Sequence, residues 1–183
     1  MGTRGLTKVI YEGETLVAQY GQWDHYPSGQ GVTAFEFLRG ADNITNLRNN
    51  IKIKTYTPSE SEMDEIVNQF ANENGMMTWE MGEQFTKMYP SLSRDTGAGI
   101  LELIANADEI VPLVLDKEFE NDDLFCEGVY TINLDDNTFT TKYGNNETVI
   151  SFDEVYNIGK EDYLIKCDCP VYQYELDNAA VSQ

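Results

Sequence analysis

The chain has 183 residues, the size of a single domain, and 41% of them are hydrophobic, enough for a buried core. It carries 32 Asp and Glu against 12 Lys and Arg, for a formal net charge of −20. Such a charge opposes binding to free DNA, free RNA and anionic membranes. It is typical of a highly soluble protein or of one that binds a basic protein surface.

The charge is uneven along the chain. Residues 1–54 hold six basic and five acidic side chains, whereas residues 55–183 hold six basic and 27 acidic ones. The first segment is therefore close to neutral and the second is strongly anionic, which indicates two surfaces with different partners.

Cysteine usage and hydropathy exclude several classes. The three cysteines, Cys126, Cys167 and Cys169, show no disulfide framework, and a CxC motif with one histidine in the chain predicts no zinc site. The acidic runs at 118–123 and 135–137 are better explained as a solvated face and a hairpin turn than as cation sites. No run of 18 apolar residues and no apolar leader is present. Together with the cysteine usage, this leads us to expect a cytoplasmic protein. We expect no metal and no cofactor.

Residues 6–20 predict a β-hairpin at the N-terminus. Both arms are rich in β-forming residues, and Glu12-Gly13 supplies a two-residue turn in which glycine accepts positive φ. A turn-rich loop follows, with the sequence QWDHYPSGQG at 22–31.

Helical spacing of apolar residues dominates the middle of the chain. Helices are expected at 33–39, 43–54, 57–72, 80–88 and 95–107.

The period changes beyond Asp108. Strands are expected at 110–115, across a hairpin at 128–145 and at 148–156, whereas 160–167 fits either a helix or a last strand. The whole chain, 1–183, is therefore expected to be one α+β domain, with a hairpin and loop at 1–31, a mostly helical part at 32–107 and a mostly antiparallel sheet at 108–176. Residues 177–183 are expected to fray.

The loop at 22–31 holds the only histidine, His25, next to Asp24. An imidazole near its ordinary pKa can act as general acid or base in RNA cleavage, so His25 and Asp24 are catalytic candidates. The second proton-transfer group would come from Lys8, Tyr20 or Tyr26, or from a partner. Arg4 and Lys8 are candidates for phosphate binding. Trp23 and Tyr26 are candidates for stacking on an unpaired base. The alternative interpretation is a structural turn, since Tyr26-Pro-Ser-Gly satisfies β-turn chemistry and Trp23 can cover the sheet.

A second catalytic alternative concerns Thr3. A Gly-Thr bond that opens a strand is where N-terminal-nucleophile hydrolases cleave themselves to free a catalytic threonine. The chain contains no GxSxG motif, no P-loop and no dinucleotide-binding glycine pattern.

The first 31 residues, MGTRGLTKVIYEGETLVAQYGQWDHYPSGQG, resemble a family of small proteins carried by phages and mobile elements of Gram-positive bacteria. The match lies in Gly2, Thr3, Arg4, Gly5, Trp23, Asp24, Tyr26, Pro27, Ser28 and Gly29. The chain is also similar to streptococcal anti-CRISPR proteins that inhibit type II Cas9 through its guide RNA.

This resemblance implies Cas9 and its guide RNA as partners, and a Cas9-dependent shortening of the guide in which the N-terminal hairpin is the working element. Two alternatives stay open. One is an acidic nucleic-acid mimic that blocks Cas9 without chemistry, and the other is the N-terminal-nucleophile-like hydrolase.

Overall fold

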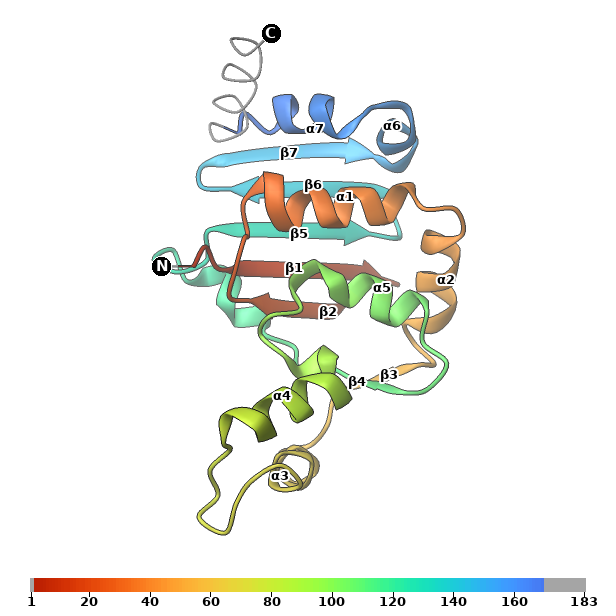
Figure 1. The fold of residues 1–183 in the computed structure, drawn as a ribbon. Helices are drawn as coiled ribbons and strands as arrows, with labels where there is room; N and C mark the ends of the chain where they lie inside the picture. The colour runs from red at the N-terminus through yellow and green to blue at the C-terminus, as the bar shows by residue number, and fades with distance from the viewer. Residues whose placement is uncertain (1, 170–183) are drawn as a thin grey trace, which may run out of the picture.

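A five-stranded mixed sheet with helices on one face forms the body of the protein in the computed structural model, which describes residues 2–169 (Figure 1). The strands lie in the order β2-β1-β5-β6-β7, and a second, two-stranded sheet pairs β3 with β4. The strands are β1 Gly5–Tyr11, β2 Glu14–Gly21, β3 Thr55–Tyr56, β4 Val111–Pro112, β5 Gly128–Asn133, β6 Thr138–Tyr143 and β7 Asn146–Ser151. The α-helices are α1 Val32–Arg39, α2 Asn43–Asn50, α3 Glu60–Asn68, α4 Trp79–Met88, α5 Ile100–Ala105, α6 Phe152–Asn157 and α7 Lys160–Lys166. Short 3₁₀ or π turns are η1 Pro27–Gly31, η2 Pro90–Leu92, η3 Gly97–Gly99 and η4 Lys117–Asn121.

The expected α+β class and single domain are confirmed. The expected hairpins at 6–20 and 128–145 are both present, as β1–β2 and β5–β6. The sheet is not wholly antiparallel, because β1 and β5 pair in parallel and join the two hairpins edge to edge. The N-terminal hairpin is therefore part of the main sheet, and β1 is an interior strand.

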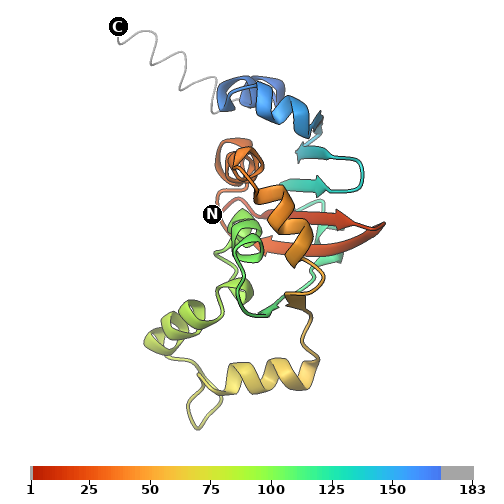
Figure 2. The same ribbon diagram turned by 90° about the vertical axis from the view of Figure 1, so that its right-hand side faces the viewer.

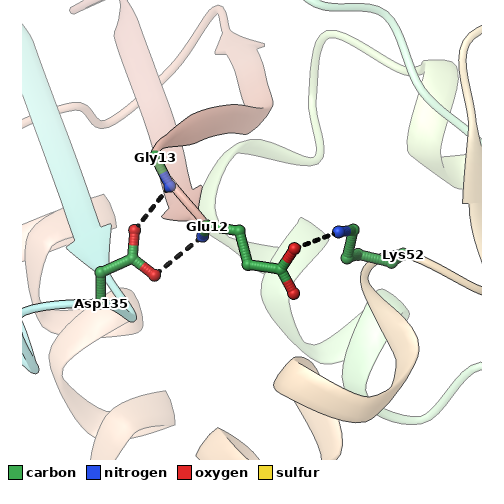
Figure 3. Close-up of polar contacts among 4 residues, drawn as sticks. All are labelled: Glu12, Gly13, Lys52 and Asp135. Atoms are coloured by element: carbon green, nitrogen blue, oxygen red, sulfur yellow. Dashed lines mark hydrogen bonds and ion pairs between the residues drawn. The ribbon is translucent and has the colours of Figure 1, made fainter.

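The tip of this hairpin is also tied to the body on two sides (Figure 3). The Asp135 carboxylate accepts hydrogen bonds of 2.8 Å from the backbone N–H groups of Glu12 and Gly13. The Glu12 side chain forms an ion pair with Lys52, which follows α2. These backbone hydrogen bonds lower the pKa of Asp135 below its usual range. The hairpin, which the resemblance implies to be the working element, is therefore fixed to the body at its tip.

The core lies between the sheet and the helices α1, α2 and α5, which cover one face in both views (Figures 1 and 2). Phe35 of α1 stacks on Tyr163 of α7 with ring centroids 4.6 Å apart. The Tyr163 and Thr141 hydroxyls hydrogen-bond to each other at 2.9 Å, which satisfies both polar groups inside the core.

The sheet alternates as period-2 patterning requires. Thr7, Tyr130 and Phe139 point into the core, whereas Lys8 and Thr131 lie on the opposite face. Which residues share a face decides which of the candidate site residues can meet.

Several expected boundaries are corrected. The expected strand at 148–156 ends at Ser151, whose hydroxyl accepts a hydrogen bond from the Glu154 N–H and begins α6. The undecided segment 160–167 is helical, as α7. The part after 108 therefore contains two α-helices as well as strands, and the expected fraying at 177–183 lies outside the described residues.

The expected helices at 57–72 and 95–107 are shorter than predicted. α3 begins only after Ser59, which forms a reciprocal capping box with Glu62, and it ends at Asn68. α5 begins at Ile100, because Gly97 takes a positive φ of 48° and starts a 3₁₀ turn instead. The expected strand at 110–115 is reduced to Val111–Pro112, which pairs with β3.

Candidate functional site

His25 lies in the interior, at 0% exposure, beneath the loop that carries it. Its ring stacks on Tyr130 at a centroid distance of 6.0 Å, and the Tyr130 hydroxyl donates to the His25 carbonyl at 2.7 Å. The His25 N–H in turn donates to the Thr3 carbonyl at 3.2 Å. The loop is therefore fastened to β5 and to the N-terminal segment through this one residue.

Two glycines of the hairpin make room for the imidazole. A Cβ built on Gly21 would lie 2.0 Å from the His25 Cε1, and one on Gly5 would lie 2.5 Å from its Cδ2. Gly5 and Gly21 face each other across the β1–β2 pair, so their missing side chains form one cradle. A larger residue at either position has to displace the ring or the backbone.

The imidazole is held neutral. Its Nδ1 lies 3.2 Å from the Trp23 carbonyl, to which it can only donate, and Nε2 has no hydrogen-bond partner among residues 2–169. Burial lowers the pKa of His25 from its ordinary 6.5 to about 4, although the Trp23 hydrogen bond and the Asp24 charge act in the opposite direction. A proton added at Nε2 would place a charge where no group in the described part of the chain accepts its hydrogen bond.

Lys8 and Tyr20 lie on the other face of the sheet. Lys8 Nζ is 2.5 Å from a Glu120 carboxylate oxygen, and its side chain is 12% exposed. Tyr20 packs edge-on against Phe119 at 5.0 Å and donates its hydroxyl to Gln22 at 2.7 Å. The structure thus separates His25 from Lys8 and Tyr20, two of the groups expected to complete an acid–base pair with it.

Asp24 and Trp23 are the most exposed members of the loop. Asp24 takes a left-handed backbone conformation, with φ of 58°, and its carbonyl accepts from the Gln30 N–H at 2.8 Å. The Trp23 ring is 46% exposed, and its Nε1 donates to Asp95 at 2.8 Å. Tyr26 is half-buried, with its ring 6.1 Å from that of Tyr143. Trp23 therefore combines exposure with a fixed orientation, as a contact residue requires.

Arg4 is half-buried, and its guanidinium lies 4.4 Å from the centre of the Phe125 ring. The same kind of engagement recurs in every basic residue of the near-neutral segment 1–54, where each cation contacts a carboxylate, a carbonyl or an aromatic ring of its own chain. They are Arg4, Lys8, Arg39, Arg48, Lys52 and Lys54. These contacts orient the cations within the fold. Only Lys8 and Lys52 are paired with a carboxylate, so the other four keep their positive charge.

The structure also bears on the other candidate reactive groups, which are Thr3, the cysteines and a possible metal site. Thr3, the candidate N-terminal nucleophile, is 4% exposed. All three thiols are free, and burial raises the pKa of Cys126 to about 11 and that of Cys167 above its usual range, so neither is a ready nucleophile at neutral pH. Within residues 2–169, no three His, Cys, Asp or Glu side chains converge on a point where a metal ion would sit.

Trp23 is hydrogen-bonded to the wall of a groove on the described surface. This groove, of about 790 Å³, runs between α4 and residues 92–95, and Asp95, the partner of Trp23, forms part of its wall. The Gln22 N–H donates to the Arg94 carbonyl at 2.9 Å, which joins the loop to the same wall. Sequence reasoning missed this groove, although the sequence Met76-Met77-Thr78-Trp79 is an apolar signal in a polar segment.

The comparisons add no relative. The chain matches no protein-family model, no curated protein and no solved structure. None of the helices in residues 2–169 combines the length and the apolar character that crossing a membrane demands.

Proposed function

We propose that the protein is an inhibitor of type II Cas9 that acts in the cytoplasm of a bacterial host. It binds guide-loaded Cas9 through its acidic surface, and its own residues contribute binding rather than proton transfer. The partner comes from the resemblance of residues 1–31 to proteins of phages and mobile elements. The positions of the candidate catalytic residues are the reason for assigning binding, and not proton transfer, to this chain.

The single observation that carries the binding role is the charge balance of the chain. Its net charge is −20, and the 27 acidic side chains of residues 55–183 dominate the charge presented to a partner, while every cation in residues 1–54 also contacts its own chain. Such a surface is attracted to the basic channel of a protein that holds RNA, and it is repelled by free RNA.

The guide shortening implied by the resemblance then depends on groups that Cas9 supplies. His25 is buried and neutral, and Lys8 and Tyr20 lie across the sheet from it. RNA cleavage through the 2′-hydroxyl needs a base and an acid that both reach one phosphodiester. The candidate residues of this chain do not meet that condition, and the buried Thr3 gives no support to the hydrolase alternative.

A gel assay separates the two modes of inhibition. Cas9, end-labelled guide RNA and the protein are incubated together, and the guide is then resolved under denaturing conditions. A shortened guide only in the presence of both proteins supports chemistry contributed by Cas9, whereas a guide of full length with loss of DNA cleavage supports blocking alone. Shortening by this protein without Cas9 contradicts the proposal.

A further inference from the structure

Residues 57–89 form a helical arm that projects from the edge of the sheet (Figures 1 and 2). Its two helices, α3 and α4, are held together by three aromatic rings. Phe70 packs edge-on against Phe85 at 5.5 Å and against Tyr89 at 6.0 Å. These rings and the buried Ile66 account for the internal packing of the arm, and other large apolar side chains of the arm stay exposed.

The arm has an unusual composition. It contains five of the six methionines of the chain, and it carries seven acidic residues against the single cation Lys87. The acidic residues are Glu60, Glu62, Asp64, Glu65, Glu73, Glu80 and Glu83. Methionine side chains are flexible and polarizable, and surfaces rich in them adapt to many apolar partners.

The apolar residues gather at the start of α4. Trp79 is 83% exposed, and Met76, Met77 and Met88 are exposed as well. Met77, Trp79 and Phe85 line the groove of about 790 Å³ between α4 and residues 92–95. Its charged lining is balanced, with Glu83 and Asp95 against Lys87 and Arg94, so the negative charge near it comes from the rest of the arm. A tryptophan this exposed beside an open groove is the kind of side chain that anchors a protein interface.

We propose that this groove binds a cationic amphipathic helix of a partner protein. Apolar side chains on one face of the helix cover Trp79 and Met77, and lysine or arginine on its flanks meets Glu80 and Glu83, both exposed on α4. A second copy of the arm is an unfavourable occupant, because it brings the same excess of negative charge. The inference rests on the proposed function only in taking the partner to be a basic protein, and it names the surface that docks.

Two model peptides test the groove without Cas9. One is a Lys/Leu peptide of about 18 residues with leucines at helical spacing, and the other has the same lysines with serine in place of leucine. In a Trp23→Phe background, Trp79 is the only tryptophan, so its emission reports directly on the groove. The Lys/Leu peptide should shift this emission to shorter wavelength and bind at least about tenfold more tightly than the Lys/Ser peptide.

Variants locate the site by the anisotropy of labelled peptide. Trp79→Ala combined with Met77→Ala should weaken Lys/Leu binding about tenfold. Tyr156→Ala combined with Ile165→Ala removes comparable exposed apolar surface from α6 and α7, and should leave binding unchanged. Because Trp79 is mostly exposed, the first pair should leave the circular dichroism and thermal midpoint of the fold close to wild type.

A second set of variants tests the acidic side chains beside the groove against matched acidic side chains on α7. Glu80→Gln with Glu83→Gln should weaken binding about two- to fivefold at low salt, whereas Glu161→Gln with Asp162→Asn on α7 should not. Equal affinity for the Lys/Ser peptide, equal affinity for a Glu/Leu peptide, or an unchanged affinity in the Trp79/Met77 variant overturns the inference.

The two proposals fail separately. Peptide binding without Cas9 inhibition leaves the groove as a docking site and contradicts the proposed function. Cas9 inhibition that survives in the Trp79/Met77 variant, together with no peptide binding, contradicts the groove alone.

Discussion

Replacing His25 by asparagine removes the only imidazole in the chain and should remove a pH dependence of stability that the wild type shows between pH 7 and pH 5. The folded protein holds the pKa of His25 at about 4, whereas the unfolded chain has the ordinary value of 6.5. Between pH 4 and pH 6.5 the unfolded chain binds a proton at His25, whereas the folded protein does not. Stability from this residue is therefore complete above pH 6.5 and is lost as the pH falls toward 4.

The size of the effect follows from the two pKa values. A separation of roughly 2.5 pH units corresponds to about 3 kcal/mol when the loss is complete, and to about 2 kcal/mol between pH 7 and pH 5. The pH range stops at 5 so that most carboxylates keep their charge. Their own contribution is common to wild type and variant, and the difference between the two proteins isolates the imidazole.

Urea denaturation of both proteins at pH 7 and pH 5 gives the four unfolding free energies. The variant should be less stable at pH 7, because it loses the packing on Tyr130, but it should lose about 2 kcal/mol less than the wild type on acidification. If the variant does not fold, the wild type alone decides, because one histidine gives one C2 proton resonance in an NMR titration. An NMR pKa close to 6.5 refutes the reasoning.

Other consequences of the same structure can be measured by denaturation as well. Gly21→Ala places a Cβ against the imidazole and should cost about 2 kcal/mol or more, whereas Gly82→Ala in α4, where nothing lies within 4 Å, should stabilise by up to about 1 kcal/mol. Asp135→Ala removes the acceptor of two backbone hydrogen bonds at the hairpin turn and should cost about 1 kcal/mol, and an unchanged midpoint would show that solvent replaces it fully. Lys8→Ala should destabilise by about 1 kcal/mol, because it breaks a half-buried ion pair, while Lys142→Ala at an exposed site should be neutral, and the opposite order contradicts the structural role of Lys8.

Local signals in the sequence predicted most elements of the fold. The Glu12-Gly13 turn and the Asp135–Asn137 turn each mark a hairpin, since both need residues that accept positive φ. The pairing of β1 with β5 could not be predicted in the same way. It joins residues more than a hundred positions apart, and no local pattern specifies which strand edges meet.

The sequence at the end of β7 contains a signal for the start of a helix. Ser151 is followed three residues later by Glu154, which is the pattern of a helix start, and Phe152 and Val155 have the spacing of a buried helical face. The alternation of Thr148 to Ser151 was extended too far into this segment. A capping residue is therefore better evidence for a boundary than the continued presence of β-forming residues.

Sequence reasoning about the site identified the loop but not the role of its histidine. A histidine in a loop rich in turns suggests exposure. However, the missing side chains of Gly5 and Gly21 leave a cradle in which the His25 ring is buried. The cradle forms only when β1 and β2 pair in this register, so its meaning depends on tertiary structure. The structural-turn interpretation of 22–31 fits this arrangement, and the RNA-binding role of Trp23 stays a prediction.

The most direct measurement is the binding of labelled protein to guide-loaded Cas9 and to the free guide, at low and high salt. We expect the protein to bind the complex at about 0.1 M salt, to bind clearly more weakly at about 0.5 M, and not to associate with the free guide at either concentration. A complex with free guide RNA alone, or no binding to Cas9 even at low salt, would contradict a protein whose acidic surface finds a basic partner.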